Sequence, residues 1–164
     1  MFKNTAHDPA RTAPAGVANN QSVPLTVLLV DDNQTFLTAI RQFLDRLGHV
    51  RIVAQALDGM SALAQWRQHR PALVLLDIAM PGMNGLELAR ALLQDAAPPQ
   101  LVFLSLHDNR EYRAAARELG ADFVSKADFV TELLPLLARK TAPSPAHDDA
   151  CRCDGASDAP GRCG

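Results

Sequence analysis

Four consecutive apolar residues, Leu73 to Leu76, run directly into Asp77 and then into a segment rich in turn residues, Pro81 to Gly85. An apolar run this short, bounded by turn residues, predicts a strand buried on both faces, as in a parallel sheet. Asp77 would then lie at the carboxyl end of the strand, where open α/β sheets place their ligands. Because an aspartate after a strand often only begins a turn, a functional site requires other polar residues at the same edge.

Strand-like and helix-like segments alternate along residues 25–140. Each strand-like run is short and apolar, whereas the segments between them carry apolar residues at helical spacing. Such alternation predicts a parallel sheet covered by helices on both faces. Gly48 is expected to end the first helix, and Pro135 to kink or shorten the last. The predicted strands cover residues 26–30, 51–56, 73–76, 101–104 and 123–125.

Composition separates this central region from two tails. The chain has 164 residues, of which 48% are hydrophobic, which suits one domain with additional segments. Residues 1–24 and 141–164 contain few large apolar side chains and are predicted to be disordered. All three cysteines, Cys151, Cys153 and Cys163, lie in the second tail at a spacing that fits no common zinc site, so free thiols are expected there.

Charge and hydropathy exclude several classes of protein. The formal net charge of −2 gives no sign of general nucleic-acid binding. No apolar run approaches the roughly 20 residues that cross a bilayer. The N-terminus lacks the apolar core of a secretory signal. A cytoplasmic protein without membrane contact is therefore expected.

Polar residues follow four of the five predicted strands. Asp31 and Asp32 follow the first, Asp77 the third, Ser105 the fourth and Lys126 the fifth. The carboxyl ends of parallel strands share one edge, so three carboxylates would meet there and repel one another. A Mg²⁺ ion would relieve that repulsion, since it prefers carboxylate and water oxygens and commonly bridges them to phosphoryl groups. A hydroxyl and a lysine beside it suit the remaining phosphoryl oxygens, which predicts a phosphoryl-transfer site.

The fragments that carry these residues resemble the receiver domain of response regulators. They are Val30-Asp31-Asp32, the segment from Asp77 to Gly85, Leu104-Ser105-Leu106-His107-Asp108, and the segment from Gly120 to Lys126. The resemblance covers residues 25–140 and implies a flavodoxin-like fold with strand order 2-1-3-4-5. The later fragments are most similar to receivers usually fused to helix-turn-helix outputs. No such output follows Lys140, so a stand-alone receiver without direct DNA binding is expected.

The resemblance assigns chemical roles to these residues. Asp77 matches the phosphoacceptor, and Asp31 and Asp32 match the acidic pair that holds Mg²⁺ together with Asp77 and the backbone carbonyl of Ala79. Lys126 matches the cation that faces the phosphoryl group. A carboxylate that attacks phosphorus mainly needs positioning and charge neutralisation, which agrees with these roles. A protein of this kind is not expected to be an enzyme beyond phosphorylating and dephosphorylating itself.

Further positions match the switch of the family or depart from it. Ser105 matches the switch hydroxyl, and Phe123 the switch aromatic, although it lacks the hydroxyl of the commoner tyrosine. Leu106 is bulkier than the residue usually found beside the hydroxyl. Together with Ala79 and His107, it is expected to tune access to the phosphoryl group and its lifetime.

Signalling through protein docking is the function that the resemblance implies. The expected donor is a sensor histidine kinase or a phosphotransfer protein. The expected output is a contact between an unknown target and the fourth helix, fifth strand and last helix of a monomer or weak dimer. A phosphorylation-independent interaction module or a phosphate sink on the same scaffold stays open. A phosphohydrolase with an aspartyl-phosphate intermediate would need an acid where Ala79 stands.

Overall fold

A computed structural model of the chain describes residues 23–107 and 109–141. The predictions for the tails, including the three cysteines, concern residues almost entirely outside these ranges. Within them no helix is long and apolar enough to cross a membrane. The strands are β1 (Leu25–Val30), β2 (Val50–Ala56), β3 (Leu73–Asp77), β4 (Gln100–Ser105) and β5 (Asp122–Ser125). The helices are α1 (Gln34–Leu44), α2 (Gly59–His69), α3 (Gly85–Leu93), α4 (Arg110–Glu118) and α5 (Phe129–Thr141).

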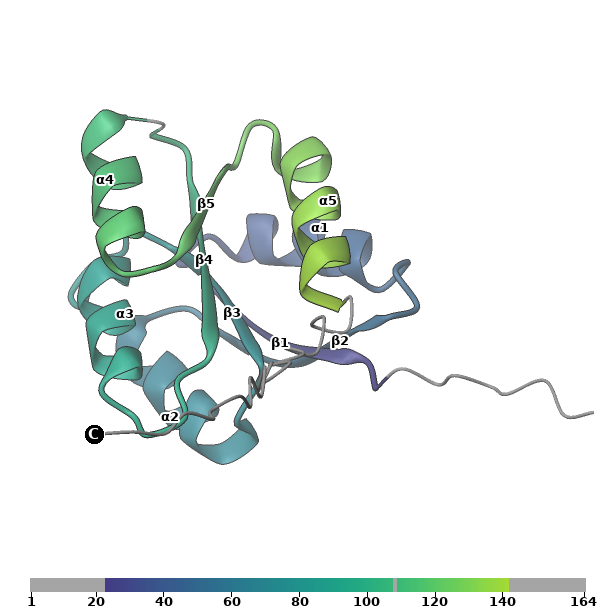
Figure 1. Cartoon of the computed structure of the whole chain (residues 1–164), viewed down its shortest axis with the longest axis horizontal. Coiled ribbons are helices and arrows are strands. Elements are labelled where there is room, and N and C mark those ends of the chain that lie inside the picture. The colour runs from purple at the N-terminus through teal and green to yellow at the C-terminus, as the bar shows by residue number, and fades with distance from the viewer. Residues whose placement is uncertain (1–22, 108, 142–164) are drawn as a thin grey trace, which may run out of the picture.

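The strands form a parallel sheet in the order β2-β1-β3-β4-β5. Helices α1 and α5 cover one face of the sheet, and α2, α3 and α4 cover the other (Figure 1). This is the predicted flavodoxin-like arrangement. Because β3 lies at the centre, every residue from Leu73 to Asp77 is buried, which explains the continuous apolar run.

Two apolar layers hold the helices to the sheet. Residues that alternate along each strand point to opposite layers: Leu28 and Val30 belong to the layer under α2, α3 and α4, and Leu29 to the layer under α1 and α5. Phe103, the largest of the fully buried side chains, lies in the layer under α2, α3 and α4. Because both faces of the sheet are covered, the polar ends of the strands are the place where side chains can reach solvent.

The ends of the first and last helices differ from the sequence prediction. α1 ends at Leu44 rather than near Gly48, because the chain tightens there into a turn in which the Leu47 N–H donates to the Leu44 carbonyl. α5 continues through Pro135 to Thr141, so a helix shortened at the proline is wrong. Pro135 lies on the exposed side of α5, where water can satisfy the backbone carbonyl that loses its partner.

The three helices that cover one face of the sheet, α2, α3 and α4, each begin with a side-chain cap. Asp58 accepts from the Ser61 N–H at the start of α2, and Asn109 accepts from the Tyr112 N–H at the start of α4. Asn84 and Glu87 form a reciprocal capping box at α3. Each of these caps satisfies N–H groups that have no partner within their helix. They fix the chain just after the strand ends.

Candidate functional site

The predicted acidic residues converge at one end of the sheet. Asp31 and Asp32 follow β1, and Asp77 ends β3 beside it. One oxygen from each of the three carboxylates lies within 4.8 Å of the others. Asp31 and Asp77 are buried, whereas Asp32 is exposed. The cluster therefore has two carboxylates facing protein and one facing solvent.

Lys126, which follows β5, reaches across β4 into this cluster. Its Nζ lies 2.6 Å from Asp31 Oδ2 and 3.1 Å from Asp77 Oδ2, and its side chain is almost fully buried. The backbone N–H of Lys126 donates to the Ser105 carbonyl at 2.9 Å, which fixes the point where the chain leaves β5. The sequence prediction that the lysine and the acidic residues share one edge is thus matched by direct ion pairs.

Asp31 is the most confined of the carboxylates. Its Oδ1 accepts from the Asn33 N–H at 2.9 Å, and its Oδ2 pairs with Lys126. Burial raises the pKa of Asp31, and this effect outweighs the lowering by Lys126 and by the Asn33 N–H; the nearby Asp77 raises it further. Both oxygens of Asp31 are engaged by protein groups, so this residue mainly anchors Lys126.

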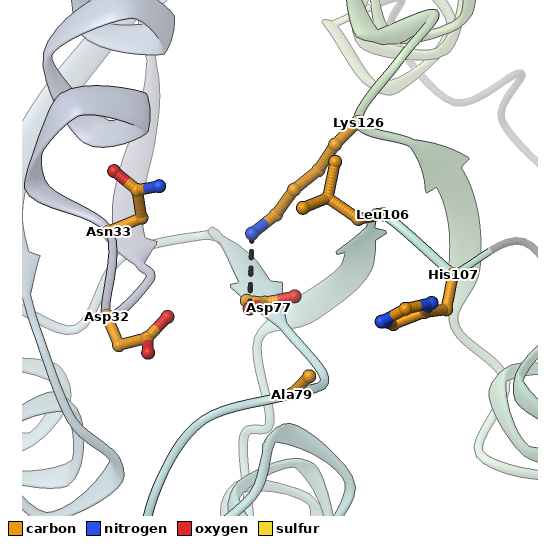
Figure 2. A pocket seen from close by; sticks show the side chains of 7 residues that line it. All are labelled: Asp32, Asn33, Asp77, Ala79, Leu106, His107 and Lys126. Carbon is orange, nitrogen blue, oxygen red and sulfur yellow. Dashed lines mark ion pairs between the residues drawn. The ribbon is translucent and has the colours of Figure 1, made fainter.

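A pocket of about 240 Å³ opens directly over Asp77. In Figure 2, Asp32 and Asn33 lie on one side of Asp77 and His107 on the opposite side, while Lys126 reaches in from above and Ala79 lies below. Neither Asp31 nor Ser105 is among the described residues that line it. The full lining comprises Asp32, Asn33, Asp77, Ala79, Leu106, His107 and Lys126.

The donor set around the pocket fits a hard divalent cation. Asp32 and Asp77 offer carboxylate oxygens within 4.8 Å of each other, and Asp32 is accessible to solvent. Ala79 lines the same pocket, where its backbone carbonyl is a further candidate ligand. Hard oxygen ligands and room for water suit Mg²⁺, whereas no described cysteine or histidine joins the acidic cluster.

The turn after Asp77 requires a glycine at its end. A Cβ on Gly85 would lie 2.0 Å from the backbone oxygen of Asp77, because the first turn of α3 packs directly on the end of β3. The Gly85 N–H also donates to the Ile78 carbonyl at 3.0 Å. This close approach holds the loop that carries Ala79 in a fixed position beside Asp77.

The proposed switch hydroxyl and its neighbours have different surroundings. Ser105 is fully buried at the end of β4, and its Oγ accepts from the His107 N–H at 3.1 Å. His107 is exposed, and its ring lies beside the pocket (Figure 2). Leu106 is 71% exposed although it is apolar, because it stands at the mouth of the pocket.

Phe123 lies in β5, half-buried against the layer under α4. The guanidinium of Arg113 in α4 stacks over its ring at 4.7 Å from the centroid. Arg113, Arg117 and Asp122 line a hollow of about 170 Å³ beside this ring. Because its guanidinium packs on the Phe123 ring, the Arg113 side chain is only partly exposed.

Sequence reasoning missed several residues that build the site. Asn33 both caps α1 and lines the pocket; its position directly before a helix could have revealed the cap. Gly85 appeared only as a turn residue. Glu132 in α5 accepts from the Ser125 N–H at 2.9 Å and so supports the segment that carries Lys126. Phe36 lies under the Lys126 ammonium, and no pattern in the sequence marks this contact.

Comparisons with known proteins place this site in a family. An uncharacterized response regulatory protein of Vibrio cholerae is 38% identical over 128 residues, which are 73% of this chain and 48% of that protein. The virulence sensor protein BvgS of Bordetella pertussis is 41% identical over 97 residues, 59% of this chain and 8% of BvgS. The chain thus spans about half or less of these curated relatives.

Solved structures agree with the sequence matches. The signal receiver domain of the response regulator NarL from Mycobacterium tuberculosis has a TM-score of 0.67 and 30% identity, covering 73% of this chain and 97% of that one. A two-component response regulator of the LuxR family from Aurantimonas has a TM-score of 0.68 and 26% identity, covering 73% and 86%. The model of the response regulator receiver domain matches residues 27–137. The chain therefore belongs to the response regulator receiver family of two-component signalling.

Proposed function

We propose that the chain accepts a phosphoryl group on Asp77 from a phosphohistidine, with Mg²⁺, and signals through phosphorylation-dependent protein docking. The observation that carries the proposal is the pairing of Asp77 with Lys126 at 3.1 Å on the floor of a pocket that is open to solvent. A buried carboxylate whose cation partner also faces a solvent-filled pocket is poised to receive a group with negative oxygens.

The reaction needs little covalent assistance from the protein. A carboxylate oxygen of Asp77 forms a bond to phosphorus while the bond from phosphorus to the donor histidine nitrogen breaks, and the imidazole leaves with the electron pair. Lys126 neutralises charge on the transferred oxygens, and Asp31, which is itself held by the Asn33 N–H, keeps the ammonium in position. A bound Mg²⁺ would supply further charge neutralisation, held by Asp32, Asp77 and the carbonyl of Ala79 with Asp31 behind them.

Two features of the pocket bear on the lifetime of the acyl phosphate. Ala79 offers no side-chain acid or base to a water that attacks phosphorus, which argues against a phosphohydrolase. His107 lies beside the pocket and Leu106 at its mouth, so these residues control which water molecules and donors reach Asp77. Hydrolysis is therefore the return step of a signalling cycle rather than the turnover of an enzyme.

The output couples the phosphoryl group to Phe123 through Ser105. A phosphoryl group on Asp77 adds nearly two negative charges and three acceptor oxygens close to the end of β4. The Ser105 hydroxyl, which accepts from the His107 N–H, can move to donate its O–H to one of these oxygens, and Phe123 then turns into the space that this movement leaves. Because Arg113 stacks on Phe123, such a turn changes the surface formed by α4, β5 and α5.

The partners follow from this scheme. The donor is a sensor histidine kinase or a phosphotransfer protein, and the target is a protein that reads the α4, β5 and α5 surface of a cytoplasmic monomer or weak dimer. A phosphate sink would keep the chemistry of Asp77 without the change around Phe123. A phosphorylation-independent interaction module would need neither.

Intact mass spectrometry tests the chemistry. Wild type incubated with phosphoramidate or acetyl phosphate and Mg²⁺ should gain one phosphoryl group, and Asp77→Asn none; equal labelling of the variant would refute the assignment. NMR shifts on addition of beryllofluoride then separate the alternatives. A switch changes resonances around Phe123 and Arg113, whereas changes confined to the pocket indicate a sink.

A further inference from the structure

The ammonium of Lys126 contacts an aromatic ring as well as two carboxylates. Its Nζ lies 4.7 Å from the centroid of the Phe36 ring, over the ring, while it pairs with Asp31 and Asp77. Phe36 belongs to the first turn of α1, which follows Asp31 and Asp32 in the chain. The lysine therefore lies between an aromatic face and two acidic groups.

The Phe36 ring is held in this orientation by other aromatic residues. Phe129, at the start of α5, packs edge-to-face on Phe36 with ring centroids 5.6 Å apart and an angle of 74°. Phe43 packs on Phe129 in the same manner, at 5.5 Å and 84°. The Phe36 backbone N–H is fixed by the capping residue Asn33. A ring face supported in this way keeps its position when Lys126 moves.

An aromatic face suits a lysine that must change partners. The negative face of the ring attracts an ammonium, yet it offers no lone pair that would compete with a phosphoryl oxygen. The ammonium has three N–H donors, and Asp31 and Asp77 account for two. A polar residue at position 36 would draw the third donor, whereas an aliphatic residue would leave the desolvated cation without attraction on that side.

We propose that Phe36 is a positioning residue for phosphoryl transfer, which holds the Lys126 ammonium over Asp77 by attraction to its ring face. The inference rests on the proposed function, because it assigns Lys126 to the transferred oxygens. When the phosphoryl group arrives, Lys126 gives up part of its pairing with Asp31. Phe36 limits that movement, so the ammonium stays within reach of the new oxygens.

Fluorination of the ring separates attraction from packing. Replacing Phe36 by mono-, di- and trifluorophenylalanine keeps the ring shape and weakens its negative face step by step. The initial rate of Asp77 labelling by phosphoramidate with Mg²⁺ should fall at each step. Phe36→Leu, which has no ring face, should lose between about twofold and about thirtyfold, the range that cation–π attraction supports.

Phe43 provides a matched control within the same aromatic cluster. It makes a similar edge contact with Phe129 but is not among the groups around the Lys126 ammonium. The same fluorinated series at Phe43, and Phe43→Leu, should leave the labelling rate within about twofold of wild type. Thermal unfolding of every variant, without Mg²⁺, identifies any that lose structure.

A second measurement does not depend on phosphorylation. The ring current of Phe36 should shift the ε-methylene protons of Lys126 upfield in NMR spectra, and Phe36→Leu should remove that shift while Phe43→Leu keeps it. Absence of the shift in wild type would overturn the inference. If wild type is not labelled at all, the proposed function fails. If wild type is labelled and Asp77→Asn is not, but the labelling rate is the same in all the Phe36 variants, only the role of Phe36 is refuted.

Discussion

Asp31→Asn should stabilise the protein in the absence of divalent cations, although it removes an ion pair at 2.6 Å. Asp31 is 1% exposed, and its carboxylate lies close to the Lys126 ammonium and to the carboxylates of Asp77 and Asp32. Asparagine has nearly the same shape and can still accept from the Asn33 N–H. The substitution therefore removes one buried charge and changes little else.

The balance of charges around Asp31 is close. At an effective dielectric constant of about 20, the Lys126 ammonium attracts its carboxylate by about 6 kcal/mol, and Asp77 repels it by at least about 3.5 kcal/mol. The remaining attraction is smaller than the several kcal/mol that it costs to remove a carboxylate from water. The pKa of Asp31 is raised, mainly by burial, which likewise indicates that the folded protein disfavours the ionised carboxylate. We expect Asp31→Asn to raise the free energy of unfolding at pH 7.5 by about 1–2 kcal/mol.

The pH dependence of the unfolding free energy follows from the raised pKa of Asp31. Because the folded-state pKa of Asp31 lies above its unfolded value, the native protein binds the proton more tightly between these two values. The cost of the ionised carboxylate is thus fully present above the folded-state pKa and is lost as the pH falls through it. Thermal unfolding in EDTA should show Asp31→Asn about 4–8 °C above wild type at pH 7.5, with the gap closing on acidification toward pH 4.

Asp32→Asn is the matched control for this measurement. It removes the neighbouring carboxylate of the same cluster, but Asp32 is exposed, so its charge is hydrated in the folded state. Its change in unfolding temperature at pH 7.5 should be well below that of Asp31→Asn. If Asp31→Asn is instead less stable than wild type at pH 7.5, the pairing with Lys126 outweighs burial and the reasoning is wrong.

Two further predictions concern the pocket and the turn beside it. Asp32→Ala should weaken Mg²⁺ binding, measured by calorimetry, by about tenfold or more, because a hard oxygen ligand is lost; unchanged affinity would remove Asp32 from the metal site. Gly85→Ala should destabilise the fold by about 2–3 kcal/mol in urea unfolding and slow the labelling of Asp77, because its Cβ would overlap the Asp77 backbone oxygen. Gly82→Ala, where a Cβ meets no atom within 4 Å but φ is +77°, should lose only about 1–2 kcal/mol and leave labelling unchanged.

The sequence predicted the fold well because its signals were local and mutually consistent. The run from Leu73 to Leu76 is continuous and apolar because β3 is covered on both faces. The errors fell where tertiary structure decides. α1 ends before Gly48 because a turn closes after Leu44, and α5 passes through Pro135 because that proline faces solvent.

The polar half of the site could be predicted for a topological reason. In a parallel sheet all strands end at one edge, so Asp31, Asp77 and Lys126 had to approach one another wherever the helices lay. No such rule exists for the apolar half. Phe36 and Phe129 occur at helical spacings that are typical of ordinary core residues, and both are in fact packed against the layer under α1 and α5.

What distinguishes Phe36 is the direction of its ring face, which depends on three separate contacts. Phe129 fixes the ring from α5, Asn33 fixes its backbone from the end of β1, and Lys126 brings the ammonium from the end of β5. The contacts with Phe129 and Lys126 join Phe36 to segments far apart in the sequence, so no short window of residues contains the information. The same holds for Gly85, which reads as a turn residue until α3 is seen to pack on Asp77. The charged residues of the site could thus be located from the strand order. The residues that hold these charges in place could be identified only from the three-dimensional structure.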